Sequence, residues 1–175
     1  VHGSGREVGQ VIVEHPDVPA LSFTGSNEVG CRLYQDGAAR LKKVQCEMGG
    51  KNPLIVLGDA DVELAAVATA QGAFGSTGQR CTATSRIYVE KKVYASFRKE
   101  LVRRAKRLVV GNGLRPRVDV GPLINAAQLE RVHAYVRLGL EEGAHAECGA
   151  RPAKGSGKNR GFYYQPTVFT HTHPD

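Results

Sequence analysis

The alternation of two kinds of segment along the chain is the feature that most constrains its fold. Short apolar runs with strand character are separated by longer segments whose apolar residues recur at helical spacing. The predicted strands are residues 20–24, 43–47, 54–57 and 86–90. The predicted helices among them are residues 29–41, 61–73 and 93–108. Because a parallel strand pair needs a long crossover, usually a helix, the pattern predicts an α/β protein with a largely parallel sheet.

The rest of the chain extends this pattern at both ends. The sequence predicts a helix over residues 5–12 that ends before His15-Pro16, and a long helix over residues 125–142. A strand over 144–149, a loop over 154–161 and an extended segment over 163–169 follow. The glycine pair Gly49-Gly50 separates two strand–helix patterns, which places a boundary near residues 46–50.

The basic balance of the chain raises nucleic-acid binding as a function class. The net charge is +7, from 24 basic and 17 acidic residues. The densest basic cluster lies within residues 98–107, where Phe97, Leu101, Ala105 and Leu108 have helical spacing, so it predicts an amphipathic helix with a solvated cationic face. No zinc finger or RNA-binding motif accompanies it, which argues against nucleic acid as the partner. No apolar run approaches the roughly 20 residues of a membrane span, and no secretory signal is visible.

The cysteines indicate free thiols rather than a metal site or a disulfide framework. Their positions, 31, 46, 81 and 148, match neither a CxxC pair nor zinc-ligand spacing. We therefore expect no metal, reduced thiols and a cytoplasmic location. His171 and His173 form a possible metal pair, but near a chain end they are expected to be exposed.

Residues 25–30 (GSNEVG) follow a predicted strand and open a predicted helix. In such a turn the backbone N–H groups and the positive end of the helix dipole face a bound phosphate, and glycines allow a close approach. The segment is not the strict GxGxxG of dinucleotide-binding folds, so alone it is equally compatible with a plain strand–turn–helix connection.

A second glycine-rich segment leads to a single cysteine. Residues 74–81 (FGSTGQRC) give substrate and cofactor room to approach the Cys81 sulfur, and the neighbouring Arg80 can stabilise its thiolate if its side chain points the same way. A cysteine in an arbitrary sequence is more often a small buried apolar residue.

Three ordered segments resemble signatures of the aldehyde dehydrogenase superfamily: residues 23–30, residues 47–53 (EMGGKNP) and residues 78–81 (GQRC). The spacing of 34 residues from Glu47 to Cys81 is also similar, and the likeness continues through residues 111–113 and 120–124. Asn27 stands where the family usually has Thr, Met48 where it has Leu, and Cys46 where it has an apolar residue. Cys46 is expected to face away from Glu47 and to serve packing.

This resemblance implies NAD(P)-dependent oxidation of an aldehyde to a carboxylic acid. The Cys81 thiolate attacks the aldehyde carbonyl and gives a thiohemiacetal, which loses hydride to the nicotinamide and becomes a thioester. Glu47 activates the water that hydrolyses the thioester, and it is a candidate base for Cys81 itself. The Cys81 backbone N–H is a candidate donor to the developing oxyanion.

The resemblance also implies the cofactor contacts, with NAD and NADP both open. They are Gly25, Ser26 and Gly30 along the pyrophosphate, Gly49 near the nicotinamide, and Gly5 and Gly9 beside the adenine. Residues 1–47 then form the C-terminal part of a Rossmann-like dinucleotide-binding domain, and residues 48–175 form the thiol-bearing catalytic domain. Lys51 is a candidate for either a cofactor contact or a structural role.

Several parts of the family's site have no counterpart in these residues. They are an oxyanion Asn and a ribose-binding Lys, which the family has upstream, and a Glu motif downstream. The chain is therefore expected to be a central fragment of a homo-oligomeric enzyme, reactive at Cys81 but with negligible turnover alone. Residues 78–86 are similar to members that act on semialdehydes, where Arg80 and Arg86 offer partners for a carboxylate. A non-catalytic protein that keeps the fold is the alternative, and the presence of both Cys81 and Glu47 argues against it.

Overall fold

The computed structural model describes residues 1–155, 158 and 160–172, and these residues form two compact units. The first unit is Val1–Gly50 and the second is Lys51–Asp175. The division falls at the glycine pair, three residues after the predicted end of the cofactor domain. Each unit is described separately below.

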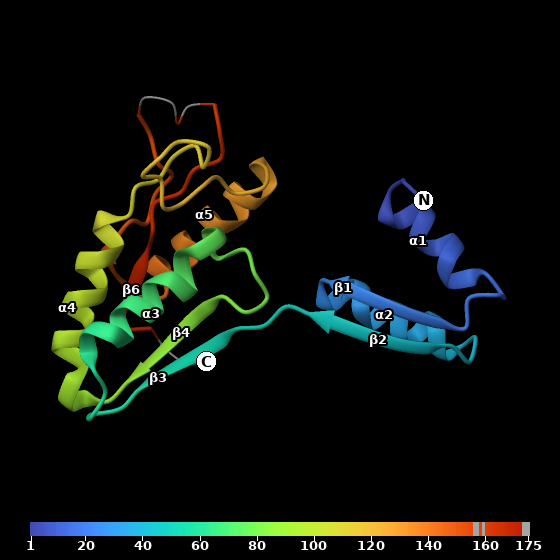
Figure 1. Cartoon of the computed structure of the whole chain (residues 1–175), viewed down its shortest axis with the longest axis horizontal. Helices are drawn as coiled ribbons and strands as arrows, with labels where there is room; N and C mark the ends of the chain where they lie inside the picture. Colours follow the sequence, from blue (N-terminus) through green and yellow to red (C-terminus); the bar gives the residue numbers. More distant parts are fainter. Residues whose placement is uncertain (156–157, 159, 173–175) are drawn as a thin grey trace. The chain divides into compact units, whose positions relative to one another are not determined.

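The first unit is a strand–helix–strand unit preceded by a helix (Figure 1). Its two strands pair in parallel, with Ala20 opposite Lys43 and Gly25 opposite Met48. The helix between them contacts both strands. Its elements are α1 (Gly5–Glu14), β1 (Ala20–Gly25), α2 (Asn27–Ala38) and β2 (Lys43–Met48).

Two glycines on α2 allow that helix to lie close to β2. A β-carbon at Gly30 would overlap the Met48 sulfur, and one at Gly37 would overlap Val44 Cγ2. Along β2 the half-buried residues alternate with exposed ones, as expected for a sheet with a helix on one face. Cys46 lies on the packed face, with its thiol 3.8 Å from the Gly30 carbonyl oxygen, whereas Glu47 is exposed.

The second unit begins with another parallel strand–helix–strand unit and ends in an antiparallel pair (Figure 1). The two strands of its first pair run parallel, and their register shifts between Asn52 and Pro53. The elements of this unit are β3 (Asn52–Val56), α3 (Val62–Phe74), the short 3₁₀ turn η1 (Gly75–Gly78), β4 (Thr84–Val89), α4 (Lys91–Arg107), α5 (Ala126–Glu141), β5 (His145–Cys148) and β6 (Val168–Thr170).

The core of the second unit lies between the β3–β4 pair and the helices α3 and α4. It is built from Val56, Ala66, Ala70, Phe97 and Leu101. Phe97, Leu101 and Ala105 are buried, as the helical spacing predicts. The alternate residues of the two strands point away from this core.

The cationic face predicted for α4 is more ordered than a solvated face. Arg103 and Arg104 both pair with Glu100 on the same helix, and Arg104 also reaches Glu63 on α3 at 2.9 Å. Arg98 pairs with Glu147 on β5 at 3.1 Å. The hydrogen bond from Arg103 and the charges of both arginines lower the pKa of the Glu100 carboxyl to about 2. The arginines of α4 therefore tie neighbouring elements together, which the spacing of charges along one helix does not reveal.

The C-terminal part differs from the prediction in two places. Of the extended segment predicted over 163–169, only Val168 and Phe169 belong to the strand β6 (Val168–Thr170), while Tyr164 forms an isolated antiparallel bridge with Pro152, and Tyr163 and Tyr164 are buried. The Tyr164 hydroxyl lies 2.9 Å from His133 Nδ1, and burial raises the pKa of Tyr164 to about 12. On α5, Val136 and Leu140 have the spacing of one helical face, but Val136 is buried whereas Leu140 is 45% exposed, so the buried face ends before the last turn.

Neither a membrane-spanning helix nor a metal-binding cluster is found among the residues that the structure describes. None of its helices is long and apolar enough to cross a membrane. No cluster of His, Cys, Asp and Glu able to hold a metal ion occurs among residues 1–155, 158 and 160–172. His171 is exposed, and His173, the other member of the possible metal pair, lies outside the described residues.

Candidate active site

Cys81 lies in a tight turn just before β4, in the second unit. The Ala83 N–H donates to the Arg80 carbonyl at 3.0 Å, so Cys81 and Thr82 occupy the two central positions of the turn. The cysteine is exposed, and its thiol is free. A nucleophile at an exposed turn between a helix and a strand is open to a substrate, as covalent catalysis requires.

The backbone before this turn has an uncommon conformation. Ser76, Thr77 and Gly78 have φ angles of 52°, 56° and 66°, which is the left-handed region. Only glycine adopts this region without cost, so Ser76 and Thr77 are strained. The Thr77 hydroxyl donates to the Ser76 carbonyl at 2.6 Å, and the Gln79 amide donates to the Thr77 hydroxyl. These bonds stabilise the sharp turn that leads the chain from the end of α3 towards Cys81.

Two side chains that directly precede Cys81, those of Gln79 and Arg80, contact the surroundings of the turn. Gln79 Oε1 accepts the Ile124 N–H at 3.0 Å. The Arg80 guanidinium lies beside Gly75 at the C-terminal end of α3, 3.7 Å from the point where a β-carbon would be. This end of a helix carries a partial negative charge that attracts a cation.

Asn52, at the start of β3, makes the direct connection to the nucleophile turn. Its Nδ2 group donates to the Cys81 carbonyl oxygen at 2.5 Å and to the Ala83 carbonyl oxygen at 3.3 Å. Nearby, the Arg86 guanidinium donates twice to the Lys51 carbonyl oxygen, at 2.8 and 3.2 Å. Arg86 therefore uses two of its donors on the backbone of this segment.

We expect Gly78→Ala to lower the free energy of unfolding of the second unit by about 1–2 kcal/mol, the usual cost of a left-handed non-glycine residue. A β-carbon there also meets the Ala73 carbonyl oxygen at 3.0 Å. Urea denaturation measures the change. Gly113→Ala is the matched control, because its β-carbon meets open space and its φ is not positive. Equal effects of the two substitutions would contradict a special role for the conformation at Gly78.

The predicted phosphate-binding residues lie together at one end of the first unit. Gly25 ends β1, and Ser26 caps α2 by accepting the Val29 N–H at 3.3 Å on its hydroxyl. The N–H groups of Asn27 and Glu28 have no partner within the helix and point out of its end. Gly30 lies on the face that packs against β2. The strand–turn–helix arrangement fits a phosphate, although Glu28 adds a negative charge to the first turn.

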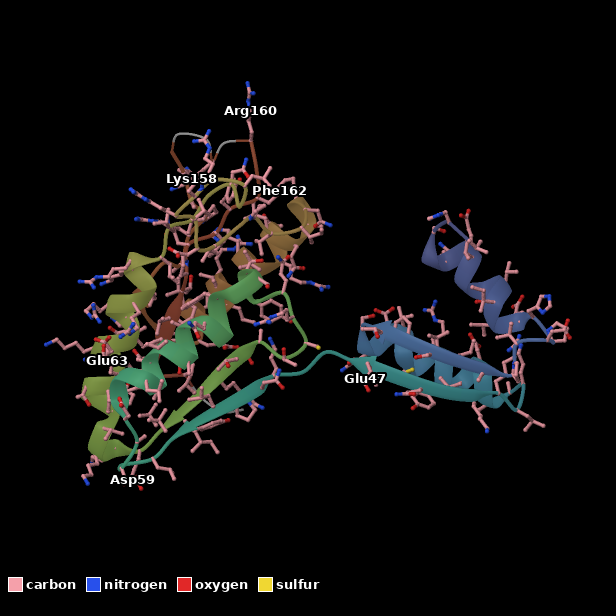
Figure 2. The ribbon with its side chains drawn as sticks, in the orientation of Figure 1. Glu47, Asp59, Glu63, Lys158, Arg160 and Phe162 are labelled. Carbon is pink, nitrogen blue, oxygen red and sulfur yellow. The ribbon has the colours of Figure 1, made fainter. Side chains whose placement is uncertain are left out.

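The other predicted residues of the first unit are exposed or face open space. Glu47 lies in β2, one residue from the end of that strand (Figure 2). Gly49 follows in the segment before the second unit, and nothing lies within 4 Å of a β-carbon placed there. Gly5 opens α1 and Gly9 lies within it, and both likewise face open space. Cys81 and Asn52 belong to the second unit, so the predicted residues are divided between the two.

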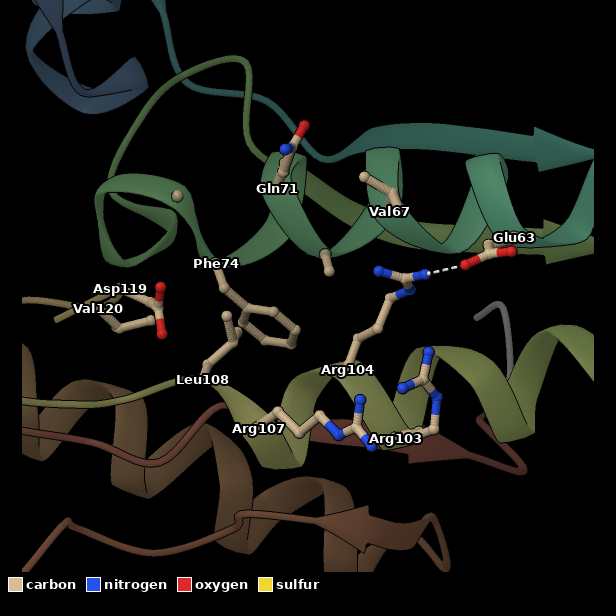
Figure 3. A pocket seen from close by; sticks show the side chains of 12 residues that line it. Glu63, Val67, Gln71, Phe74, Arg103, Arg104, Arg107, Leu108, Asp119 and Val120 are labelled. Carbon is tan, nitrogen blue, oxygen red and sulfur yellow. Dashed lines mark hydrogen bonds and ion pairs between the residues drawn. The ribbon is translucent and has the colours of Figure 1, made fainter. Parts of the chain in front are cut away.

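An open hollow of about 700 Å³ lies elsewhere in the second unit, between α3 and α4 (Figure 3). Phe74 and Leu108 line an apolar end of the hollow. The Arg104 side chain reaches across the hollow and forms an ion pair with Glu63. Neither Cys81 nor Asn52 lines it. Its arginines are largely matched by carboxylates, so it is a gap between two helices bridged by ion pairs rather than the place where the thiol acts.

The chain belongs to the aldehyde dehydrogenase family, whose family model matches residues 1–175. It is 44% identical over 169 residues to an alpha-ketoglutaric semialdehyde dehydrogenase of Bacillus subtilis, covering 97% of this chain and 35% of that protein. It is 40% identical over 175 residues to a betaine aldehyde dehydrogenase of the same organism, covering 100% and 36%. The chain thus spans about a third of the length of the curated relatives it matches.

Solved structures agree with this assignment. A betaine aldehyde dehydrogenase from Staphylococcus aureus in complex with NAD+ matches with a TM-score of 0.95 and 33% identity, over 99% of this chain and 34% of that one. A 3,6-anhydro-L-galactose dehydrogenase in complex with NADP matches with a TM-score of 0.95 and 35% identity, over 99% and 36%. The family and the α/β fold predicted from the sequence are confirmed.

Neither the contact of Asn52 with Cys81 nor the left-handed turn is predicted from the sequence. Asn52 appeared there only as one letter of a motif. The sequence does contain a signal for Asn52. Proline cannot donate to the backbone ladder, so an amide side chain directly before a proline at the start of a strand marks a place where a donor is missing. The positive φ angles of Ser76 and Thr77 leave no such signal, since neither residue type prefers that region.

Proposed function

We propose that the full-length protein carrying this chain is an NAD(P)-dependent aldehyde dehydrogenase, with Cys81 as nucleophile and Glu47 as general base. The observation that supports this most strongly is the exposed, free thiol of Cys81. It lies in a turn that is held on both sides by hydrogen bonds, within a chain that belongs to this family throughout its length. The isolated chain of 175 residues is proposed to retain thiol reactivity but little turnover.

In the proposed mechanism the Cys81 thiolate adds to the aldehyde carbon, and a carbon–sulfur bond forms as the carbonyl π pair moves onto oxygen. The backbone N–H of Cys81 donates to this oxyanion. A bound nicotinamide would supply the hydride acceptor, so that loss of hydride from the tetrahedral carbon would leave a thioester on Cys81. Addition must come first, because only the tetrahedral carbon has the electron density to expel hydride.

Glu47 completes the proposed reaction as a general base. Its carboxylate takes a proton from water, the hydroxide attacks the thioester, and the carbon–sulfur bond breaks to release the carboxylic acid and the Cys81 thiolate. Its exposure in β2 leaves the carboxylate free for this exchange. Cys46 lies on the packed face of the same strand and is proposed to take no part in the reaction.

The cofactor is proposed to lie along the end of β1 and α2. Asn27 and Glu28 offer N–H groups to the pyrophosphate, and Gly25 and Ser26 leave space for it. Gly30 brings the helix close to the strand, Gly49 would lie near the nicotinamide, and Gly5 and Gly9 would lie beside the adenine. Relatives crystallised with NAD+ and NADP support a nicotinamide cofactor of either kind.

The proposed substrate is a small aldehyde, and a semialdehyde is the finer proposal. A relative that acts on alpha-ketoglutaric semialdehyde supports it. Arg80 is proposed as the partner of the substrate carboxylate, since Arg86 already uses two donors on the Lys51 carbonyl. We propose a cytoplasmic location and a homo-oligomer, with neither nucleic acid nor a membrane as partner. Relatives named as cytosolic support the location.

Residue-resolved alkylation of the 175-residue chain tests the proposed nucleophile. At neutral pH, we expect iodoacetamide to label Cys81 roughly tenfold faster than Cys31, which is also exposed and serves as the reference. Cys148 should react slowest, because burial raises the pKa of its thiol and leaves less thiolate at this pH. Peptide mass spectrometry gives the rates. Equal labelling of Cys81 and Cys31 would contradict an activated Cys81.

A further inference from the structure

We infer that Asn52 is a positioning residue, whose side-chain amide sets the conformation of the nucleophile turn. This inference rests on the proposed role of Cys81. The observation behind it is that Asn52 Nδ2 donates to two carbonyl oxygens of the turn, those of Cys81 at 2.5 Å and Ala83 at 3.3 Å. The amide thus joins the first residue of β3 to a segment some thirty positions further along the chain.

The position of Asn52 at the end of the strand pair explains why a side chain is needed. The register of β3 and β4 begins with Asn52 opposite Thr84 and is irregular between Asn52 and Pro53. Pro53 has no N–H to give to the ladder. Cys81 lies before β4, beyond the first paired residues, so the backbone ladder does not reach it. The Asn52 amide extends the contact of β3 to the nucleophile turn.

The two bonds constrain the atoms that matter for the proposed reaction. Because the peptide group is planar, fixing the Cys81 carbonyl oxygen fixes the plane of the Cys81–Thr82 peptide and therefore the ψ angle of Cys81. On the other side, the bond from the Ala83 N–H to the Arg80 carbonyl closes the turn. The backbone of Cys81, and with it the direction of the bond from its α-carbon to its β-carbon, is then set by a turn with little freedom. Directly before the turn, the Gln79 side chain accepts the Ile124 N–H and holds the incoming backbone.

The inference predicts an order of reactivity among variants of Asn52, measured in the 175-residue chain. The readout is the iodoacetamide labelling rate of Cys81 divided by that of Cys31 in the other unit. Asn52→Ala removes both donors and is expected to lower this ratio roughly tenfold. Asn52→Ser retains one donor and should lie between the wild type and Asn52→Ala. Asn52→Asp keeps the shape, lacks the donors and places a negative charge beside two carbonyl oxygens, so it should give the lowest ratio.

The order of the Ala and Asp variants separates positioning from simple packing. If Asn52 only filled space, the isosteric Asn52→Asp would stay close to the wild type and Asn52→Ala would be worse. Thr167→Ala is the matched control, since Thr167 is also half-buried and its hydroxyl also bonds two backbone groups, the Ala150 N–H and the Gln165 carbonyl. It should leave the ratio unchanged. An unchanged ratio in Asn52→Ala, or Asn52→Asp above Asn52→Ala, would overturn the inference.

Hydrogen exchange gives a second readout that does not depend on the chemistry of the thiol. In Asn52→Ala the Ala83 amide, which donates to the Arg80 carbonyl oxygen, should exchange roughly tenfold faster, while the amides of α4 keep their wild-type rates. Accelerated exchange throughout the second unit, with none specific to the turn, would also overturn the inference. Equal labelling of Cys81 and Cys31 in the wild type would contradict the proposed function, and the exchange of the turn amides would still decide the role of Asn52.

Discussion

Replacing Cys81 by Ser in the full-length protein is expected to abolish NAD(P)-dependent aldehyde oxidation, with a loss on the order of 10⁴-fold or more in kcat. Losses of that order follow removal of a covalent nucleophile from other enzymes. The hydroxyl is nearly the size of the thiol but is not ionised at neutral pH, so it does not add to the aldehyde without a dedicated base. Formation of the reduced nicotinamide, followed by its absorbance, measures the loss.

The matched control for this substitution is Cys31→Ser, because Cys31 is the other exposed cysteine among the described residues. It is expected to retain wild-type turnover. Turnover that survives Cys81→Ser would contradict the assignment of the nucleophile. Robust turnover by the isolated 175-residue chain, lost in its Cys81→Ser variant, would leave the nucleophile in place and contradict only the expectation that the chain is inactive alone.

Replacing Glu47 by Gln is expected to lower the steady-state rate by about 10²–10⁴-fold, the usual contribution of a general base. The first turnover behaves differently. Gln keeps the size of the side chain but cannot accept the proton of water, so the thioester accumulates. At alkaline pH, rapid mixing should show a burst of reduced nicotinamide close to one per site, followed by a slow phase.

The burst distinguishes the two roles proposed for Glu47. Retention of the burst with loss of the slow phase places Glu47 in hydrolysis of the thioester. Loss of the burst at neutral pH, with recovery at alkaline pH, adds the deprotonation of Cys81. Gln45→Ala, at another exposed position of β2, is the control for the strand and should leave both phases unchanged. Wild-type hydrolysis in Glu47→Gln would contradict a role as base.

Much of the fold could be predicted because its elements have strong local signals. The spacing of Phe97, Leu101 and Ala105 predicts the buried face of α4, and all three side chains are buried. Residues 163–169 have strand composition, but most of them do not form a strand. There, Tyr164 forms only an isolated bridge with Pro152 and its hydroxyl contacts His133, and no pattern within the segment contains these partners.

The candidate site shows the same division. The motifs around Gly25, Glu47 and Cys81 are contiguous in sequence, so resemblance to the family identifies them as proposals. The connection from Asn52 to Cys81 joins residues far apart in the chain, and the left-handed turn depends on contacts made by Thr77 and Gln79. Such features follow from tertiary structure, because strain is tolerated only where the surroundings hold it in place.

The most direct test of the central proposal is to identify the residue that carries the acyl group. The full-length Glu47→Gln protein is mixed with an aldehyde and oxidised nicotinamide cofactor, quenched in acid, digested and examined by peptide mass spectrometry. We expect one modified peptide, with Cys81 carrying the mass of the aldehyde less two hydrogen atoms, and no modification without the cofactor. An acyl group on Cys31, Cys46 or Cys148, or turnover with no acyl group on Cys81, would contradict it.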